Sequence, residues 1–345
     1  MEFDIKTAAD TWDNIGAFAR DMESIGASGL LFTESGQVPW MMVAAAAMAA
    51  PSLDYSTGIA VAFPRSPMVT AQIAWELARN TKGKFRLGLG SQVKPHIVRR
   101  YGVEFDKPAM RMRDYVLAVK ASLAAFRGEA RLEHEGPFYQ LNLLTPHWAP
   151  ERHNYEDIKI DMSAVNPLML KVTGEVADGL HVHPMHSMPY IENRVLPKLA
   201  EGAQKAGRSL DDIDLIVPVL AVAGDTHEER AALEREAKSA ISFYGSTPVY
   251  SFQFDDLGHE GTRLKLAEKL RAGDMEGLID TVSDELLDQF GLVARWDDMA
   301  DKLIARYKGV ASRVVMYFAK QSIDENPDNL GKWGEIARAV RAAQG

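Results

Sequence analysis

An apolar stretch typical of a β-strand is followed by a segment typical of a helix eight times along this sequence. The strand-like stretches are EFDIK, LLFTE, YSTGIAVAF, FRLGLG, IKIDMSAV, GLHVHP, DLIVPVLAVAG and RVVMYFA. Most are apolar without interruption, which is typical of strands buried on both faces of a parallel sheet. No linker separates the units. The series therefore predicts a closed (β/α)8 barrel, a TIM barrel, in preference to two doubly wound domains.

The chain is longer than a minimal barrel requires. Its 345 residues are 46% hydrophobic, enough for one large core, whereas a minimal barrel needs about 250 residues. We therefore expect a single domain over residues 1–345 with insertions at about 128–157 and 246–292. The first contains ARLEHEGPFYQLNLL, which is typical of a hairpin, and the second is helical. Because insertions after barrel strands lie over the active face, both are expected to shape the substrate pocket.

The composition excludes several classes of protein and of site. The absence of cysteine rules out disulfides, thiolate catalysis and cysteine-based metal sites. A net charge of −9 argues against nucleic acid as the main partner. The N-terminal residues do not form an export signal, and the apolar run at 38–51 is too short to cross a bilayer. We expect a cytoplasmic protein that binds neither nucleic acid nor a membrane.

Two glycines end the fourth strand-like stretch, in FRLGLGSQVKPHIVRRYG at residues 85–102. The spacing is not that of a dinucleotide fingerprint, because Val93 stands where a third glycine is needed, and the Gly-Lys-Ser/Thr ending of a P-loop is absent. In a barrel, Gly90, Ser91 and Gln92 would lie at the C-terminal rim, where backbone without a side chain lets a planar or phosphorylated ligand come close. A tight turn that binds no ligand fits the same spacing.

Three stretches, GIAVAFPRSPMVTAQIAWEL, KFRLGLGSQVKPHIVRRYGVEF and NPLMLKVTGEVADG, resemble the luciferase-like monooxygenase superfamily. They are most similar to its branch of oxidoreductases that use coenzyme F420, a deazaflavin. The similarity extends over nearly the whole chain. It implies a bacterial-luciferase-like TIM barrel with insertions, a flavin or deazaflavin lying across the strand ends, and a non-proline cis peptide after the third strand.

The resemblance also implies roles for individual residues. It matches an acidic residue after the second strand to Glu34, whereas Gln37 lies near the usual position of a histidine base and could act only as a neutral donor. It implies the cis peptide near residues 58–60 and the cofactor phosphate at the start of the helix after the fifth strand. The residues that it assigns to cofactor binding are Glu34, Gly58, Ile59, Ala60, Gly90, Ser91, Gln92, His96, Ala164, Val165 and Asn166.

His181 and His183 alternate along the sixth strand, so both side chains are expected on the same face, toward the barrel mouth. A neutral imidazole there could orient a substrate carbonyl or relay a proton, and the candidate catalytic residues are His181, His183 and Gln37. A hydrogen-bonded structural pair is the alternative. No nearby carboxylate has ligand spacing, so we predict no metal. The charged tail of F420 needs local positive charge, for which the candidates are Arg65, Lys94, Arg99, Arg100 and Lys171.

Three functions are consistent with these residues. The first is an F420-dependent oxidoreductase that transfers a hydride to or from a small, largely apolar or conjugated organic substrate. The second is an FMN-dependent two-component monooxygenase, and the third is a barrel whose site is degenerate and non-catalytic. Because reduced flavin reacts with oxygen whereas a deazaflavin transfers hydride, the identity of the cofactor decides the reaction. If the chain assembles, we expect a homodimer.

Overall fold

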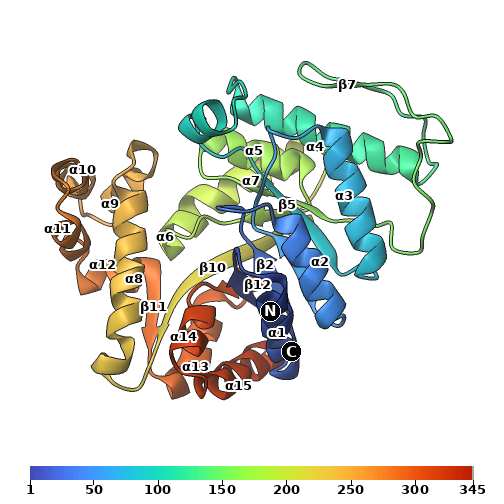
Figure 1. Ribbon diagram of the computed structural model, residues 1–345. Coiled ribbons are helices and arrows are strands. Elements are labelled where there is room, and N and C mark those ends of the chain that lie inside the picture. The colour runs from blue at the N-terminus through green and yellow to red at the C-terminus, as the bar shows by residue number, and fades with distance from the viewer. Residues whose placement is uncertain (344–345) are drawn as a thin grey trace.

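The computed structural model describes residues 1–343 and contains a closed ring of eight parallel strands (Figure 1). Each strand pairs with the next in chain order, and the last pairs with both its predecessor and the first, which closes the ring. The (β/α)8 barrel predicted from the sequence is therefore confirmed. Its strands are β1 (Glu2–Thr7), β2 (Gly29–Phe32), β3 (Asp54–Thr57), β5 (Phe85–Gly90), β8 (Ile160–Ser163), β9 (Gly179–His181), β10 (Asp214–Ala223) and β12 (Arg313–Met316).

Helices cover the outside of the ring. Several begin at a proline, whose fixed φ suits the first helical turn and whose missing N–H would have no partner there. Over residues 1–343, the structure has no helix whose length and apolar composition would let it span a bilayer. The covering helices are α1 (Trp12–Ser24), α2 (Pro39–Ala49), α3 (Pro67–Asn80), α4 (Pro108–Phe126), α5 (Pro167–Val176), α6 (Met188–Tyr190), α7 (Leu196–Lys205), α13 (Trp296–Tyr307), α14 (Ala319–Glu325) and α15 (Asn329–Ala342).

The third strand is broken, although the sequence predicts it as one stretch. The Gly58–Ile59 peptide bond is cis and separates β3 from the short strand β4 (Ala60–Val61), which pairs with β5. The non-proline cis peptide that the family resemblance implies after this strand is confirmed. It lies at the C-terminal end of the barrel, the end that we call the mouth.

The first insertion is a hairpin, as predicted. Strands β6 (His134–Glu135) and β7 (Gln140–Leu141) pair antiparallel and extend away from the barrel at the upper right of Figure 1. A buried carboxylate on α4 holds the base of the hairpin: Asp114 accepts hydrogen bonds from the backbone N–H groups of Phe138 (2.8 Å) and Tyr139 (2.9 Å), and its Oδ1 lies 2.9 Å from His134 Nε2. The hairpin is thereby attached to the outer helix layer.

The second insertion contains helices, as predicted, and one strand that the sequence analysis missed. The strand is β11 (Gly291–Ala294), which pairs with the outer half of β10 at residues 220–223. The segment has its own apolar core, separate from the main one. It packs beside α8, on the left of Figure 1. Its helices are α9 (Phe252–Asp255), α10 (Thr262–Ala272), α11 (Met275–Asp280) and α12 (Asp284–Phe290), and α8 (His227–Gly245) precedes the segment in the chain.

The interior of the barrel is filled at mid-height by apolar side chains. Leu31 of β2, Ile216 of β10 and Val315 of β12 contact one another, with Tyr317 packed against them. Because β2 and β10 are not neighbours in the ring, this contact crosses the lumen. The side chains in it therefore identify which face of each strand points inward.

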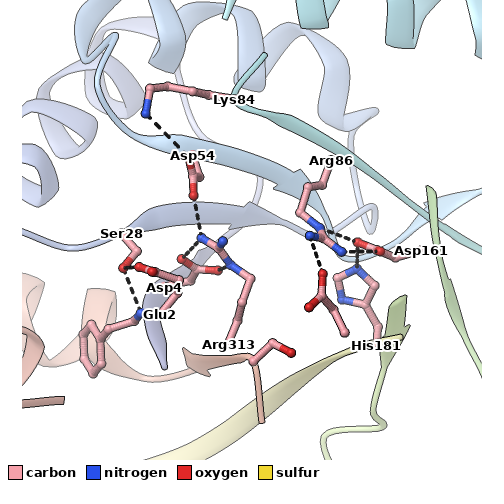
Figure 2. Close-up of polar contacts among 12 residues, drawn as sticks. Glu2, Asp4, Ser28, Asp54, Lys84, Arg86, Asp161, His181 and Arg313 are labelled. Atoms are coloured by element: carbon pink, nitrogen blue, oxygen red, sulfur yellow. Dashed lines mark hydrogen bonds and ion pairs between the residues drawn. The ribbon is translucent and has the colours of Figure 1, made fainter. Parts of the chain in front are cut away.

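Ion pairs close the N-terminal end of the barrel (Figure 2). Arg313 binds Asp4 on the neighbouring β1 at 2.7 Å and Asp54 on β3 at 3.0 Å. Arg86 binds Asp161 at 2.7 Å on the neighbouring β8 and Asp214 on β10 at 2.8 Å. Both arginines thus join strands that are not adjacent in the ring.

The charged form of Asp161 depends strongly on these ion pairs, because its side chain is fully buried. Burial alone would raise the pKa of Asp161, but the Arg86 guanidinium and His181 outweigh it and hold that pKa well below its usual value. The folded state therefore gains stability from this carboxylate at neutral pH. That gain disappears only as the pH falls from about 4 toward the lower folded-state pKa.

Replacing Asp161 by Asn should lower the free energy of unfolding by about 3 kcal/mol at pH 7, because it leaves a buried guanidinium without its main partner. Asp214, whose side chain is 40% exposed, binds the same guanidinium and provides the control. Urea denaturation of both variants measures the difference. Equal losses for Asp161→Asn and Asp214→Asn would contradict a role for burial in this layer.

Candidate active site at the barrel mouth

The residues predicted for the site come from five different strand ends. They follow β2, β3, β5, β8 and β9, and the carboxyl ends of these parallel strands meet at the mouth. In barrels of this class the loops at this end carry the active site. The ring closure therefore brings together residues that are more than 140 positions apart in the sequence, such as Glu34 and His183.

Glu34 is held by a residue from the third unit of the barrel. Its carboxylate accepts hydrogen bonds from both terminal nitrogens of Arg65, at 2.6 and 2.8 Å, and from the backbone N–H of Val61 at 2.8 Å. The Glu34 side chain is 2% exposed. Arg65 also donates to the Val61 carbonyl at 2.7 Å and lies 5.4 Å from the Trp40 ring centroid. Glu34 thus fixes the backbone just beyond the cis peptide, with its charge already neutralised by Arg65.

The cis peptide and the end of β5 form one surface. A Cβ atom on Gly58 would lie 2.5 Å from the methyl groups of Leu31, so only glycine fits between the peptide and the barrel interior. A Cβ atom on Gly90 would lie 2.6 Å from Ser163 Oγ and 2.7 Å from the Ile59 side chain. Glycine at position 58 thus leaves room for the Leu31 side chain, and glycine at position 90 leaves room for Ser163 and Ile59.

The chain beyond β5 turns sharply at the rim. Gln92 has a positive φ of 56°, and its Oε1 accepts the N–H of Val93 at 3.0 Å. Ser91 Oγ donates to the Gln92 carbonyl at 3.2 Å. His96 opens a single π-helical turn (His96–Arg100) and is exposed. The sequence predicts that Gly90, Ser91 and Gln92 lie at the rim, with a tight turn as the alternative. The residue with a left-handed backbone in this segment is Gln92.

The loop after β8 leads directly into a helix whose start carries no cap. Ala164 is buried, and the Val165 carbonyl accepts a hydrogen bond from Tyr190 at 3.2 Å. Asn166 precedes α5 with an extended backbone (φ −82°), and its side chain makes no capping hydrogen bond. The N–H groups of the first turn of α5 therefore remain suited to bind an anion.

The expected basic residues are only partly available to a ligand. Arg65 is bound to Glu34, Lys171 pairs with Glu201 on α7, and Arg100 donates to the Ser35 carbonyl. Lys94 and Arg99 are exposed on the rim segment after β5. Positive charge for an anionic tail is thus concentrated at the β5 side of the mouth.

His181 and His183 differ in depth. His181 is 6% exposed, and its buried Nε2 lies 3.6 Å from Asp161 Oδ2, too far for a hydrogen bond (Figure 2). A Cβ atom on Gly88 would lie 2.6 Å from this nitrogen. His181 therefore faces inward, as predicted, but its Nε2 points down toward the ion-pair layer.

His183 lies beyond the end of β9, between two tyrosine rings. Its ring centroid is 4.7 Å from that of Tyr244 and 4.4 Å from that of Tyr250. Its Nδ1 accepts the N–H of Met185 at 3.1 Å, which leaves the proton of the neutral ring on Nε2. Burial lowers the pKa of His183 to about 4. At neutral pH it is an uncharged hydrogen-bond donor.

Several residues at the mouth were not predicted from the sequence, and the role of Gln37 stays a prediction. Gln37 is exposed in the loop before α2. Lys6, whose ammonium lies 5.5 Å from the Tyr317 ring centroid, was not predicted, although it alternates along β1 with Glu2 and Asp4. Tyr244, Tyr250 and Tyr317 were also missed. Among residues 1–343, no three His, Cys, Asp or Glu side chains are grouped so that they could hold a metal ion.

The mouth therefore has two chemically different halves. We call the first the glycine half; it contains Gly58, Ile59, Gly90, Ser91 and Asn166. We call the second the tyrosine half; it contains Lys6, His183, Tyr244, Tyr250 and Tyr317. The first half offers the cis peptide and a helix start, and the second offers aromatic rings and polar donors.

Comparison with known proteins agrees with this geometry. The model of the family described as luciferase-like monooxygenase matches residues 2–313. An uncharacterized protein of Mycobacterium tuberculosis is 34% identical over 301 residues, which cover 87% of this chain and 88% of that protein. The 5,10-methylenetetrahydromethanopterin reductase of Methanopyrus kandleri is 26% identical over 79% of this chain and 78% of its own length.

Solved structures share the fold. The coenzyme F420 dependent tetrahydromethanopterin reductase of Methanopyrus kandleri superimposes with a TM-score of 0.79, at 20% identity and 97% coverage of both chains. The oxygenating constituent of 3,6-diketocamphane monooxygenase from Pseudomonas putida, solved with FMN, gives a TM-score of 0.66 at 15% identity, over 99% of this chain and 97% of that one. Similar barrels thus serve two different cofactors.

Replacing Glu34 by Gln should lower the free energy of unfolding by about 3 kcal/mol, because Arg65 is then buried without its partner. Glu151 pairs with Arg79 at 3.4 Å, but its side chain is 83% exposed. Glu151→Gln should therefore change stability by less than about 0.5 kcal/mol. Chemical denaturation compares the two variants, and similar values for both would argue against a structural role of the Glu34 pair.

Stability should also depend on His183. Since burial lowers its pKa to about 4, the unfolded chain binds a proton that the folded protein does not bind between about pH 6.5 and 4. The free energy of unfolding should therefore fall as the pH falls through this range, by up to about 3 kcal/mol for this residue.

His183→Gln should remove that part of the pH dependence. His227, whose side chain is 81% exposed, is the control, and His227→Gln should leave the pH dependence as it is in the wild type. Denaturation midpoints between pH 4 and 7 provide the measurement. An unchanged pH profile in His183→Gln would show that this imidazole is not held neutral.

Proposed function

Because the chain belongs to the luciferase-like monooxygenase family, we propose that it is an oxidoreductase that uses coenzyme F420. It transfers a hydride to or from a small, largely apolar or conjugated organic compound. The observation that carries this proposal is the cis Gly58–Ile59 peptide at the barrel mouth, where Glu34 and Arg65 hold the backbone just beyond it and the start of α5 at Asn166 carries no cap. Similarity to enzymes that are described as F420-dependent supports the choice of cofactor.

The residues of the glycine half fit a deazaflavin. A planar ring can lie against the Gly58–Ile59 peptide, whose two residues are partly exposed at the strand end. The uncapped start of α5 at Asn166 suits the phosphate, and Lys94 and Arg99 are free at the rim for a charged tail. When bound, such a cofactor supplies or accepts a hydride and reacts little with oxygen.

The polar side chains at the mouth would serve the substrate. His183 can donate a hydrogen bond from Nε2 to a substrate oxygen without changing its charge, because its pKa is about 4. His181 would influence the substrate from deeper in the barrel, where its Nε2 lies near Asp161. Gln37 would contribute only as a neutral donor from the exposed loop. The tyrosine rings favour a conjugated or aromatic substrate, which can stack on them.

An FMN-dependent monooxygenase is the second candidate. It is favoured by the similarity to the barrel solved with FMN, and it would use the same glycine half for ring and phosphate. A degenerate, non-catalytic barrel is disfavoured by the Glu34–Arg65 pair, which keeps the backbone around the cis peptide in place.

Purified protein should bind F420 at least about tenfold more tightly than FMN, because Lys94 and Arg99 can contact the longer charged tail. Quenching of cofactor fluorescence measures both affinities. Asn166→Asp adds a negative charge at the start of α5 and should weaken F420 binding at least about tenfold, whereas Asn80→Asp, at the far end of α3, should not. Equal or reversed affinities for the two cofactors would favour the monooxygenase.

A further inference from the structure

Lys6 is a charged residue inside the barrel that has no role in the function proposed above. It lies on the same face of β1 as Asp4, whose carboxylate binds Arg313 across the strand pair, so its side chain also points into the lumen. Its Nζ lies 5.5 Å from the Tyr317 ring centroid. Among residues 1–343, no carboxylate forms an ion pair with this ammonium, and no atom hydrogen-bonds to it.

The surroundings of Lys6 disfavour an unpaired charge. Burial lowers the pKa of the Lys6 ammonium, and the Glu236 carboxylate on α8 acts against this shift from a longer distance. A partly desolvated ammonium without an acceptor is unfavourable. An acceptor oxygen on a ligand in the mouth would offset the desolvation of the Lys6 ammonium. Negative charge on that oxygen would in turn be stabilised strongly by the ammonium.

Lys6 lies beside Tyr317, and two further tyrosines, Tyr244 and Tyr250, contact each other. Tyr317 packs on the apolar plug of the lumen, and Tyr244 is close enough to influence its ionisation. Tyr244 and Tyr250 in turn enclose the His183 ring. Burial raises the pKa of all three tyrosines, that of Tyr250 to about 12, so their hydroxyls stay protonated. Within the described chain, none of these hydroxyls has a hydrogen-bond partner.

Lys6 is also close to the glycine half. It is paired in register with Leu31 on β2, and the Leu31 methyl groups contact Gly58 of the cis peptide. A molecule lying between the two halves would therefore present one face to the Gly58–Ile59 surface and an edge to Lys6 and Tyr317. This is the arrangement that a reaction between a ring-shaped cofactor and a substrate requires.

Resting on the proposed function, we propose that Lys6 is a catalytic residue that binds the oxygen of a conjugated or aromatic carbonyl substrate, stacked on Tyr317, and protonates that oxygen on reduction. The carbonyl carbon gains a hydride from the reduced deazaflavin, and the C=O π bond breaks toward oxygen. The oxygen takes a proton from Lys6 Nζ, which becomes a neutral amine and regains a proton from water. The product is the alcohol, and the deazaflavin is oxidised by two electrons.

The oxygen-binding role can be tested without turnover and without cofactor. The probe is 4-nitrophenol, a planar aromatic whose ionised oxygen resembles the developing alkoxide and whose anion absorbs visible light. A pH titration of the bound probe measures how strongly the site favours its anion. We expect the bound probe to ionise at a pH at least about one unit lower than the free probe, a tenfold change in its ionisation constant.

Lys6→Met should abolish this shift, and Lys6→Arg should retain most of it. Lys320, whose Nζ lies 5.2 Å from the Phe18 ring centroid on the outside of the barrel, provides a matched lysine on an aromatic ring, and Lys320→Met should behave as the wild type. The proposal is overturned if 4-nitrophenol does not bind, or if Lys6→Met leaves its ionisation unchanged. Failure of F420 to bind, with the probe behaving as expected, would refute the proposed cofactor and leave the role of Lys6 intact.

Discussion

Two arginine side chains inside the barrel, Arg86 and Arg313, hold together strands that are not neighbours in the sheet. Each binds one carboxylate on an adjacent strand and one across the lumen. A guanidinium can do this because its five donors lie in one plane and reach two carboxylates at once. These ion pairs close the N-terminal end of the ring, and the apolar contact of Leu31, Ile216 and Val315 fills its middle. Only the C-terminal end remains for ligands.

The groups that remain at this end are distributed unevenly, and the reason lies in the strands that carry them. Around β3, β5 and β8 the chain has the cis peptide and an uncapped helix start, which offers backbone N–H groups. Around β9, β12 and β1 it has histidine, tyrosine and lysine, and α8 brings Tyr244 to the same place. A ligand that needs close backbone contact fits the first side, whereas a ligand that needs stacking and hydrogen-bond donors fits the second. Two molecules that react with each other would meet between them.

The sequence was informative about elements and less so about contacts between them. All eight barrel strands and the hairpin of the first insertion were predictable, because each is a local apolar pattern bounded by turns. The partner of Glu34 was not, because Arg65 is 31 residues away and only the folded backbone brings the two together. The side on which His181 lies follows from alternation, but its depth depends on register with β8. Lys6 could have been noticed as the third charged residue, after Glu2 and Asp4, on one face of β1. The strand β11 was missed because it begins at Gly291, directly after α12 ends at Phe290, with no turn between them.

A crystal structure of the protein with F420 bound is the most direct test of this division of the mouth. We predict that the deazaflavin ring lies against the Gly58–Ile59 peptide with its phosphate at the start of α5, and that Lys6, His183 and Tyr317 remain uncovered on the opposite side. A ring stacked on the tyrosines, with its phosphate away from Asn166, would contradict the assignment of both halves.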